Sequence, residues 1–253
     1  MTTAVAAAFS VEMLLMIALP IIAAVVICRR HSLPLTVPLA AASFFIINMI
    51  ITAPLTRGLI PANFGRSTVI LLLGTVAYSI CQELARYASF RFAPALQFRR
   101  NDWAGVAAGV GFGGAEAIVI GVQFAWGMGV ILLAPQRLGP GVAEQTLSAS
   151  PWLFLLTGLD RVPAIICSVA FSLLVVMAFR KGTYFLWVAI GLHAALDVVL
   201  LTAQRFLPGI WHEVVFVTLA VIAVVFIRRT IRGGTLSATP EGYQTSSPAT
   251  VGP

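Results

Sequence analysis

Short polar segments divide this sequence into seven apolar runs, most of them about as long as a helix that crosses a bilayer. The runs span roughly residues 10–28, 35–56, 68–90, 103–133, 151–179, 183–203 and 212–227. Only 10% of the 253 residues are charged, whereas about 25% is usual for a soluble domain. Runs of this length suit helices rather than the shorter strands of a membrane barrel. We therefore predict an all-α, polytopic membrane protein with about seven transmembrane helices.

The same boundaries predict the domain organisation. Residues 1–232 are expected to form one seven-helix transmembrane domain, and the Ser/Thr/Pro-rich residues 233–253 a disordered cytoplasmic tail. The net charge of +7 does not indicate nucleic-acid binding, because the 16 Lys and Arg residues lie mostly in short clusters between the apolar runs. The expected partners are the lipid bilayer and a membrane-embedded or lipidic substrate.

The basic residues are distributed unevenly between alternate loops. Ten follow the first, third, fifth and seventh runs: Arg29, Arg30, Arg91, Arg99, Arg100, Arg180, Lys181, Arg228, Arg229 and Arg232. Four lie in the other loops: Arg57, Arg66, Arg137 and Arg205. Cytoplasmic loops carry the excess of Lys and Arg. We therefore predict a multi-pass protein of the cell membrane with its N-terminus outside and its C-terminus in the cytoplasm.

Several ionisable residues interrupt the apolar runs. Glu116 lies in the middle of "GFGGAEAIVIGVQ", where a charged group costs at least ~2.5–3.5 kcal/mol on insertion scales. The others are Glu83 and Arg86 in the third run, Asp160 and Arg161 in the fifth, and His193 and Asp197 in the sixth. Single residues of this kind can be salt bridges that fix helix register. A set on several helices makes a functional site the default hypothesis.

Helix geometry predicts which of these side chains meet. Counting ~1.5 Å per residue from the cytoplasmic ends places five of them at similar depth: Glu83, Glu116, Cys167, His193 and Asp197. Asp160 would lie about 10 Å further out. It would join the others only if the fifth run bends, and Pro163 offers a reason for bending. His193 and Asp197 share a helix face, and Glu83 and Arg86 can pair along theirs.

The fourth run has small residues at every fourth position: Gly105, Gly109, Gly113, Ala117 and Gly121. This spacing allows another helix to approach closely. We predict that the third, fifth or sixth run packs against this glycine ladder, which would bring Glu116 to Glu83, His193 and Asp197. Carboxyl groups at that range cannot all be ionised, so at least one is expected to hold a proton near neutral pH.

Four short motifs follow one another in successive runs. They are Q-E-x-x-R at Gln82, Glu83 and Arg86, F-x-x-x-E at Phe112 and Glu116, D-R at Asp160 and Arg161, and H-x-x-x-D at His193 and Asp197. Over roughly residues 68–200, this series resembles the YhfC-type intramembrane proteases, which are similar to the wider group containing the PrsW and CAAX prenyl proteases. The resemblance implies a membrane-embedded hydrolase in which a glutamate activates water, with help from histidine and acidic residues of neighbouring helices.

The resemblance also assigns roles. It implies that Glu83, Glu116, His193, Asp197 and Asp160 are catalytic, with Gln82, Arg86, Phe112 and Arg161 in support. Such enzymes are described both as metal-dependent and as glutamic-type. A metal, with zinc as the candidate, would sit among Glu116, Cys167 and His193. Three positions depart from the family pattern: Gln82 stands for Glu, Asp160 for Glu and Cys167 for His. A glutamine cannot act as a general base.

Two other functions use the same residues. A buried carboxylic acid can protonate an alkene or epoxide, and aromatic faces stabilise a carbocation. With walls that include Phe112, Trp126, Trp152, Tyr184 and Trp187, the pocket would suit an integral membrane cyclase or isomerase of a prenylated, isoprenoid lipid. The third alternative is a non-catalytic binding or transport bundle, although the repeats and paired broken helices typical of transporters are not evident in the sequence.

Overall fold

The computed structural model describes residues 2–59 and 67–234, and within them it confirms the all-α fold. Seven helical segments are long and apolar enough to cross a membrane: Thr3–Arg30, Thr36–Thr56, Thr68–Phe92, Asp102–Leu133, Pro151–Arg180, Tyr184–Phe206 and Ile210–Arg232. They correspond in order to the seven predicted runs. The first begins at Thr3 rather than near residue 10, because the alanine-rich start is also helical and the Thr2 hydroxyl caps it by accepting from the Val5 N–H at 3.3 Å.

The first segment comprises α1 (Thr3–Met13), a π-helical stretch (Leu14–Ala18) and α2 (Leu19–Arg30). The second comprises α3 (Thr36–Ala53) and a π-helical stretch (Pro54–Leu59). Next come α5 (Thr68–Phe92), the short α6 (Pro94–Gln97), α7 (Asp102–Leu133), a 3₁₀ turn (Pro135–Arg137) and α8 (Val142–Leu147). The remaining helices are α9 (Pro151–Leu159), α10 (Arg161–Arg180), α11 (Tyr184–Phe206) and α12 (Gly209–Arg232). The predicted tail lies outside the described residues from position 235 onward.

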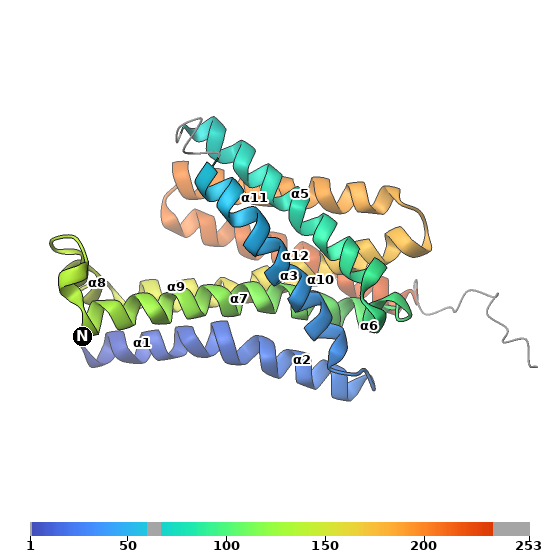
Figure 1. Ribbon diagram of the computed structural model, residues 1–253, viewed down its shortest axis with the longest axis horizontal. Helices are drawn as coiled ribbons and strands as arrows, with labels where there is room; N and C mark the ends of the chain where they lie inside the picture. Colours follow the sequence, from blue (N-terminus) through green and yellow to red (C-terminus); the bar gives the residue numbers. More distant parts are fainter. Residues whose placement is uncertain (1, 60–66, 235–253) are drawn as a thin grey trace, which may run out of the picture.

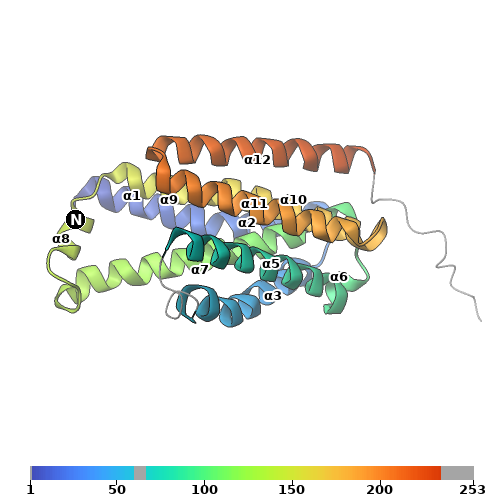
Figure 2. The ribbon, with the colours of Figure 1, turned by 90° about the horizontal axis from the view of Figure 1, so that it is seen from above.

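Helices α7 and α10 form the centre of the bundle. Residues 104–115 of α7 and 167–178 of α10 are buried without interruption, as expected for helices surrounded by others. Helices α1 and α2 run alongside α7, and α3 crosses it (Figure 1). Seen from above, α12 runs along one edge of the molecule and α3 along the opposite edge (Figure 2). Apolar side chains on the outer helices are exposed, as a lipid-facing surface requires.

The glycine ladder of α7 packs against α10, in the fifth run. A Cβ atom added at Gly109 would lie 2.4 Å from the Cα of Val169, and one added at Gly113 would lie 2.7 Å from the Cβ of Ser168. The far end of the ladder meets the first run, since a Cβ at Gly121 would lie 2.9 Å from the Cβ of Met16. The close approach predicted for small residues is therefore present, and of the three candidate partners the fifth run takes the ladder.

We predict that Gly109→Ala destabilises the protein by ~1–3 kcal/mol, because the new methyl group would press on the backbone of Val169. Gly127→Ala is the matched control on the same helix, since its Cβ would meet nothing within 4 Å. The control should be neutral or slightly stabilising, because alanine is the better helix former. Thermal unfolding of the two variants in detergent checks this. Equal midpoints would contradict the role given to Gly109.

The fifth run is interrupted at Asp160, where α9 ends and α10 begins. Pro163 has no N–H, so the Leu159 carbonyl cannot receive the usual helical hydrogen bond from the residue four positions on. On either side of this missing hydrogen bond the helical backbone hydrogen bonds continue. The Asp160 N–H donates to the Leu156 carbonyl, and the Ala164 N–H donates to the Asp160 carbonyl. The interruption falls at the acidic residue whose depth had set it apart from the others.

The basic loops gather at one end of the bundle. The Arg180 side chain donates to the backbone carbonyl of Arg100 at 3.2 Å, and α6 lies at the same end as the last turn of α12 (Figure 1). We predict that this end is cytoplasmic. A reporter fused after Pro253 should be active only in the cytoplasm. Activity of that fusion on the outer side would contradict the predicted orientation.

Candidate functional site

A cavity of about 1000 Å³ lies between α5, α7, α9, α10, α11 and α12. Its wall follows α11 from His193 through Asp197 to Leu207. Eight of the residues singled out in the sequence line it: Gln82, Arg86, Glu116, Asp160, Arg161, Cys167, His193 and Asp197. Four membrane-length segments far apart in the sequence therefore contribute polar groups to one space inside an otherwise apolar bundle.

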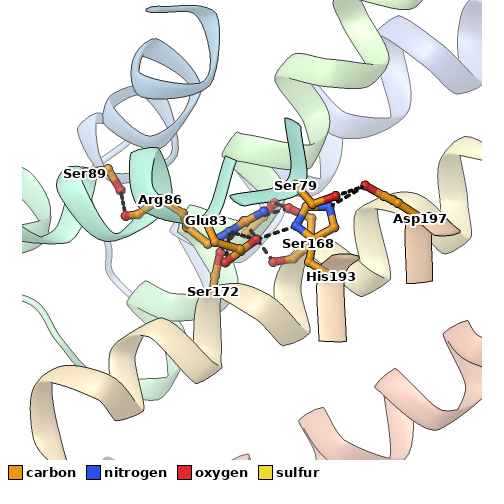
Figure 3. Close-up of polar contacts among 9 residues, drawn as sticks. Ser79, Glu83, Arg86, Ser89, Ser168, Ser172, His193 and Asp197 are labelled. Atoms are coloured by element: carbon orange, nitrogen blue, oxygen red, sulfur yellow. Dashed lines mark hydrogen bonds and ion pairs between the residues drawn. The ribbon is translucent and has the colours of Figure 1, made fainter. Parts of the chain in front are cut away.

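Glu83 and His193 form the closest contact at this site. The His193 Nδ1 atom lies 2.7 Å from Glu83 Oε1, and the Glu83 side chain is fully buried (Figure 3). The imidazole stacks on Phe171 with 4.5 Å between ring centroids, which fixes its plane. A carboxylate on one ring nitrogen fixes the orientation of the imidazole. Glu83 lies closer to the ring than Asp197, the residue that shares a helix face with His193.

Arg86 holds Glu83 in place. Its Nε donates to both Glu83 carboxylate oxygens, at 3.1 and 3.2 Å. Its Nη1 donates to the Ser168 hydroxyl at 2.9 Å and to the Ser172 hydroxyl at 2.8 Å (Figure 3). The guanidinium carbon lies over the Phe112 ring, 4.0 Å from its centre, in a cation–π contact. Arg86 therefore ties α5 to α10 and neutralises a carboxylate that would otherwise be buried alone.

Asp197 lies on the other side of the imidazole. Its Oδ2 atom is 3.6 Å from His193 Nε2 and accepts a hydrogen bond from the Ser79 hydroxyl at 2.7 Å (Figure 3). The i,i+4 pairing predicted on one face of α11 is therefore present. Together the two carboxylates give the ring of His193 a proton acceptor at each nitrogen.

Glu116 reaches the cavity from α7 but differs from Glu83. It is half-buried and lines the cavity, and it has no hydrogen-bond partner among the residues that the structure describes. Arg161 and His193 are ionisable groups that line the same cavity as Glu116. A carboxylate that faces a polar cavity with its oxygens uncommitted can accept a hydrogen bond from water or a substrate.

The supporting residues have different positions. Gln82 lines the cavity and is 2% exposed. Phe112 lies behind Arg86, where it also packs edge-on against Phe45 at 5.2 Å between ring centroids. Cys167 is buried and lines the cavity on α10. Arg161 lines it too, although its buried Nε has no hydrogen-bond partner within the described chain.

Asp160 shares the cavity but not the contacts of His193. Its partners are His212 and Glu213 at the start of α12. The depth argument had separated Asp160 from the other acids, and the structure keeps it apart from the Glu83–His193 pair. The catalytic role that the resemblance implies for Asp160 stays a prediction.

The predicted metal ligands were Glu116, Cys167 and His193. Within residues 2–59 and 67–234, the group of three His, Cys, Asp or Glu side chains with ligand atoms within 4.8 Å of one another is instead Asp160, His212 and Glu213. His193 already directs Nδ1 to Glu83. The arrangement around His193 therefore does not fit three-ligand binding as it stands, and that metal set stays a prediction.

The aromatic walls proposed for a lipid cyclase are not where that function needs them. Trp126, Trp152, Tyr184 and Trp187 are 76%, 58%, 58% and 69% exposed, respectively. None of the four lines the cavity, and Phe112 is buried behind Arg86. This correction has a simple cause: amphipathic aromatic rings are favoured at membrane interfaces, so their presence in the sequence does not place them inside.

Several polar residues of the site were missed in the sequence. Ser168 and Ser172 lie four apart on α10, and this spacing in an apolar run signals a polar stripe. Ser79 lies one turn before Glu83 and carried the same signal. His212 and Glu213 lie near the start of α12, at the edge of the last predicted run. Glu12, 1% exposed, was overlooked in the first run, where it packs beside Gly158 of α9.

Comparison with known proteins confirms the family resemblance. A family model described as "YhfC intramembrane metalloprotease" matches residues 15–225. A relative from Bacillus subtilis (strain 168), described as "Uncharacterized membrane protein YhfC", is 34% identical over 151 residues. That match covers 53% of this chain and 57% of the relative, so it spans little more than half the relative's length. No solved structure matches. Because the family model covers most of the chain, this protein belongs to the YhfC intramembrane metalloprotease family.

Proposed function

We propose that this protein is an intramembrane peptide hydrolase whose reaction takes place in the cavity beside His193. The observation that carries the proposal is the 2.7 Å contact that buried Glu83 makes with His193, which lines the same cavity as the uncommitted carboxylate of Glu116. A base, an oriented imidazole and a buried carboxylate are the components that general acid–base hydrolysis requires.

The roles follow from the contacts of each side chain. Glu116 takes a proton from a cavity water, whose oxygen attacks the carbonyl carbon of the scissile peptide bond. His193 gives the Nε2 proton to the leaving amine as the C–N bond breaks. The proton on Glu116 then returns to His193 through solvent, which restores both groups. This cycle consumes one water and uses only protein side chains.

The remaining groups position these two. Glu83 holds Nδ1 of His193, Arg86 holds Glu83, and Asp197 lies beside Nε2. Arg161 places a positive charge near Glu116, where negative charge develops on the substrate oxygen during attack. A fixed positive group at that point lowers the barrier more than it would in water, because the site is partly closed to solvent.

The substrate we propose is a membrane-embedded peptide segment. The cavity lies inside a bundle of membrane-length helices and holds about 1000 Å³, which is the size of a site for a segment of several residues. A peptide bond in hydrocarbon is shielded from bulk water, so a polar cavity within the bilayer must supply both the water and the proton acceptor.

The test is cleavage of single-span model helices in proteoliposomes, followed by mass spectrometry of the products. Wild-type protein should cleave, and His193→Ala should reduce the rate at least about 100-fold. His31→Ala is the control, since His31 stacks on Trp103 outside the cavity. If His193→Ala cleaves as fast as His31→Ala, the proposed role of His193 is wrong. Binding of the helices without cleavage would instead favour a non-catalytic bundle.

A further inference from the structure

We propose that Asp160, His212 and Glu213 form a binding site for a divalent transition-metal ion, with zinc as the example. The site lies where α11 ends and α12 begins, at the far end of the cavity from His193. The cavity follows α11 from His193 to Leu207, which is roughly 20 Å of helix. It is therefore separate from the Glu83–His193 pair and does not depend on the proposed hydrolysis.

The three side chains converge from two parts of the chain. One ligand atom from each lies within 4.8 Å of the other two. His212 Nδ1 is 3.4 Å from Glu213 Oε1, and a carboxylate oxygen of Asp160 lies within 4.8 Å of the ligand atoms of both residues. Asp160 is brought there by the interruption between α9 and α10. The cluster thus combines residues about fifty positions apart in the sequence, which local helix geometry alone would not bring together.

Two carboxylates with oxygens within 4.8 Å of each other repel unless a proton or a cation lies between them. The neighbouring Arg161 makes no hydrogen bond or ion pair with either carboxylate within the described chain, and its buried Nε has no hydrogen-bond partner there. A divalent cation would neutralise both carboxylates at once. The half-buried position of all three residues also reduces competition from bulk water.

The donor set selects the kind of ion. One imidazole nitrogen and two carboxylate oxygens suit zinc, copper, iron or nickel, whereas magnesium and calcium prefer oxygen ligands alone. Zinc binds such donors at about 2.0–2.2 Å. Ligand atoms already within 4.8 Å of one another need only small side-chain rotations to reach it. Since all three residues line the cavity, a fourth coordination position would be open to cavity water.

A bound ion would join the start of α10 to the start of α12. These helices pack together along the bundle, and the cluster lies at the end of that contact. The ion would therefore stabilise the folded protein in proportion to its concentration relative to the dissociation constant. This gives a readout that needs neither substrate nor activity.

The experiment uses the full chain, purified in detergent and dialysed against EDTA. Zinc is titrated by calorimetry, and bound zinc is measured after desalting. Wild-type protein should bind one zinc per chain and unfold at a higher temperature when loaded. Glu213→Gln and His212→Ala should each weaken zinc binding by more than the roughly 10–100-fold that loss of an outer-shell partner causes. Glu213→Gln preserves shape, so it remains informative if His212→Ala does not fold.

His193→Ala is the matched control, and it should bind zinc within about twofold of wild type because His193 lies outside the cluster. The proposal is overturned if wild-type protein binds no zinc, or if Glu213→Gln binds it as tightly as wild type. It is also overturned if His193→Ala loses zinc, since that result would locate the ion at Glu116, Cys167 and His193.

Discussion

Glu116→Gln is expected to abolish hydrolysis while leaving the fold intact. Glutamine has nearly the same size and hydrogen-bonding groups, but it cannot accept a proton. Glu116 has no hydrogen-bond partner among the described residues, so the amide would break no existing contact. Its proposed task is proton abstraction from water, and loss of a general base typically lowers a rate 10²–10⁴-fold. We therefore expect a loss of about 10³-fold or more, with an unchanged unfolding midpoint.

The measurement is cleavage of the same model helices in proteoliposomes, beside thermal unfolding in detergent. Glu144→Gln is the control, because Glu144 lies on α8, is exposed and does not line the cavity. It should be as active as wild type. A Glu116→Gln protein that unfolds would show that the carboxylate is part of the scaffold. A Glu116→Gln protein that folds and cleaves normally would show that Glu116 is not the general base.

Arg86→Ala is expected to destabilise the protein by ~3–5 kcal/mol, the cost of breaking a buried ion pair by removing one partner. Arg86 is 2% exposed and Glu83 is fully buried, so solvent cannot replace the lost guanidinium. The variant would also leave the hydroxyls of Ser168 and Ser172 without their donor and remove a link between α5 and α10. A decrease in the unfolding midpoint in detergent is the readout.

Two comparisons separate the ion pair from a general effect of removing arginine. Arg91 lies on the same helix at an exposed position. The variant Arg91→Ala should therefore change the free energy of unfolding by no more than about 0.5 kcal/mol. The double variant Arg86→Met with Glu83→Gln removes both charges and should be more stable than Arg86→Ala alone. If the double variant is less stable than the single one, Glu83 is not destabilised by the loss of Arg86, and the pairing argument is wrong.

The fold, and several of the ionisable residues that line the cavity, were readable from the sequence. The helical spans depend on the length and composition of local segments, and a bilayer leaves them few alternatives. Glu83 with Arg86, and His193 with Asp197, are neighbours on one helix face, so their spacing alone predicted contacts that the structure contains. The glycine ladder likewise predicted a close helix contact, because the absence of a side chain is visible in the sequence.

Only the tertiary structure decided which side chains from different helices meet. His193 pairs most closely with Glu83 rather than Asp197, and Asp160 meets His212 and Glu213 rather than His193. The tryptophans face outward. These outcomes depend on the rotation of each helix about its axis and on its partner. Both are set by packing between segments distant in the sequence. The glycine ladder indicated that a helix would approach closely, but not that Gly109 would meet Val169 of the fifth run.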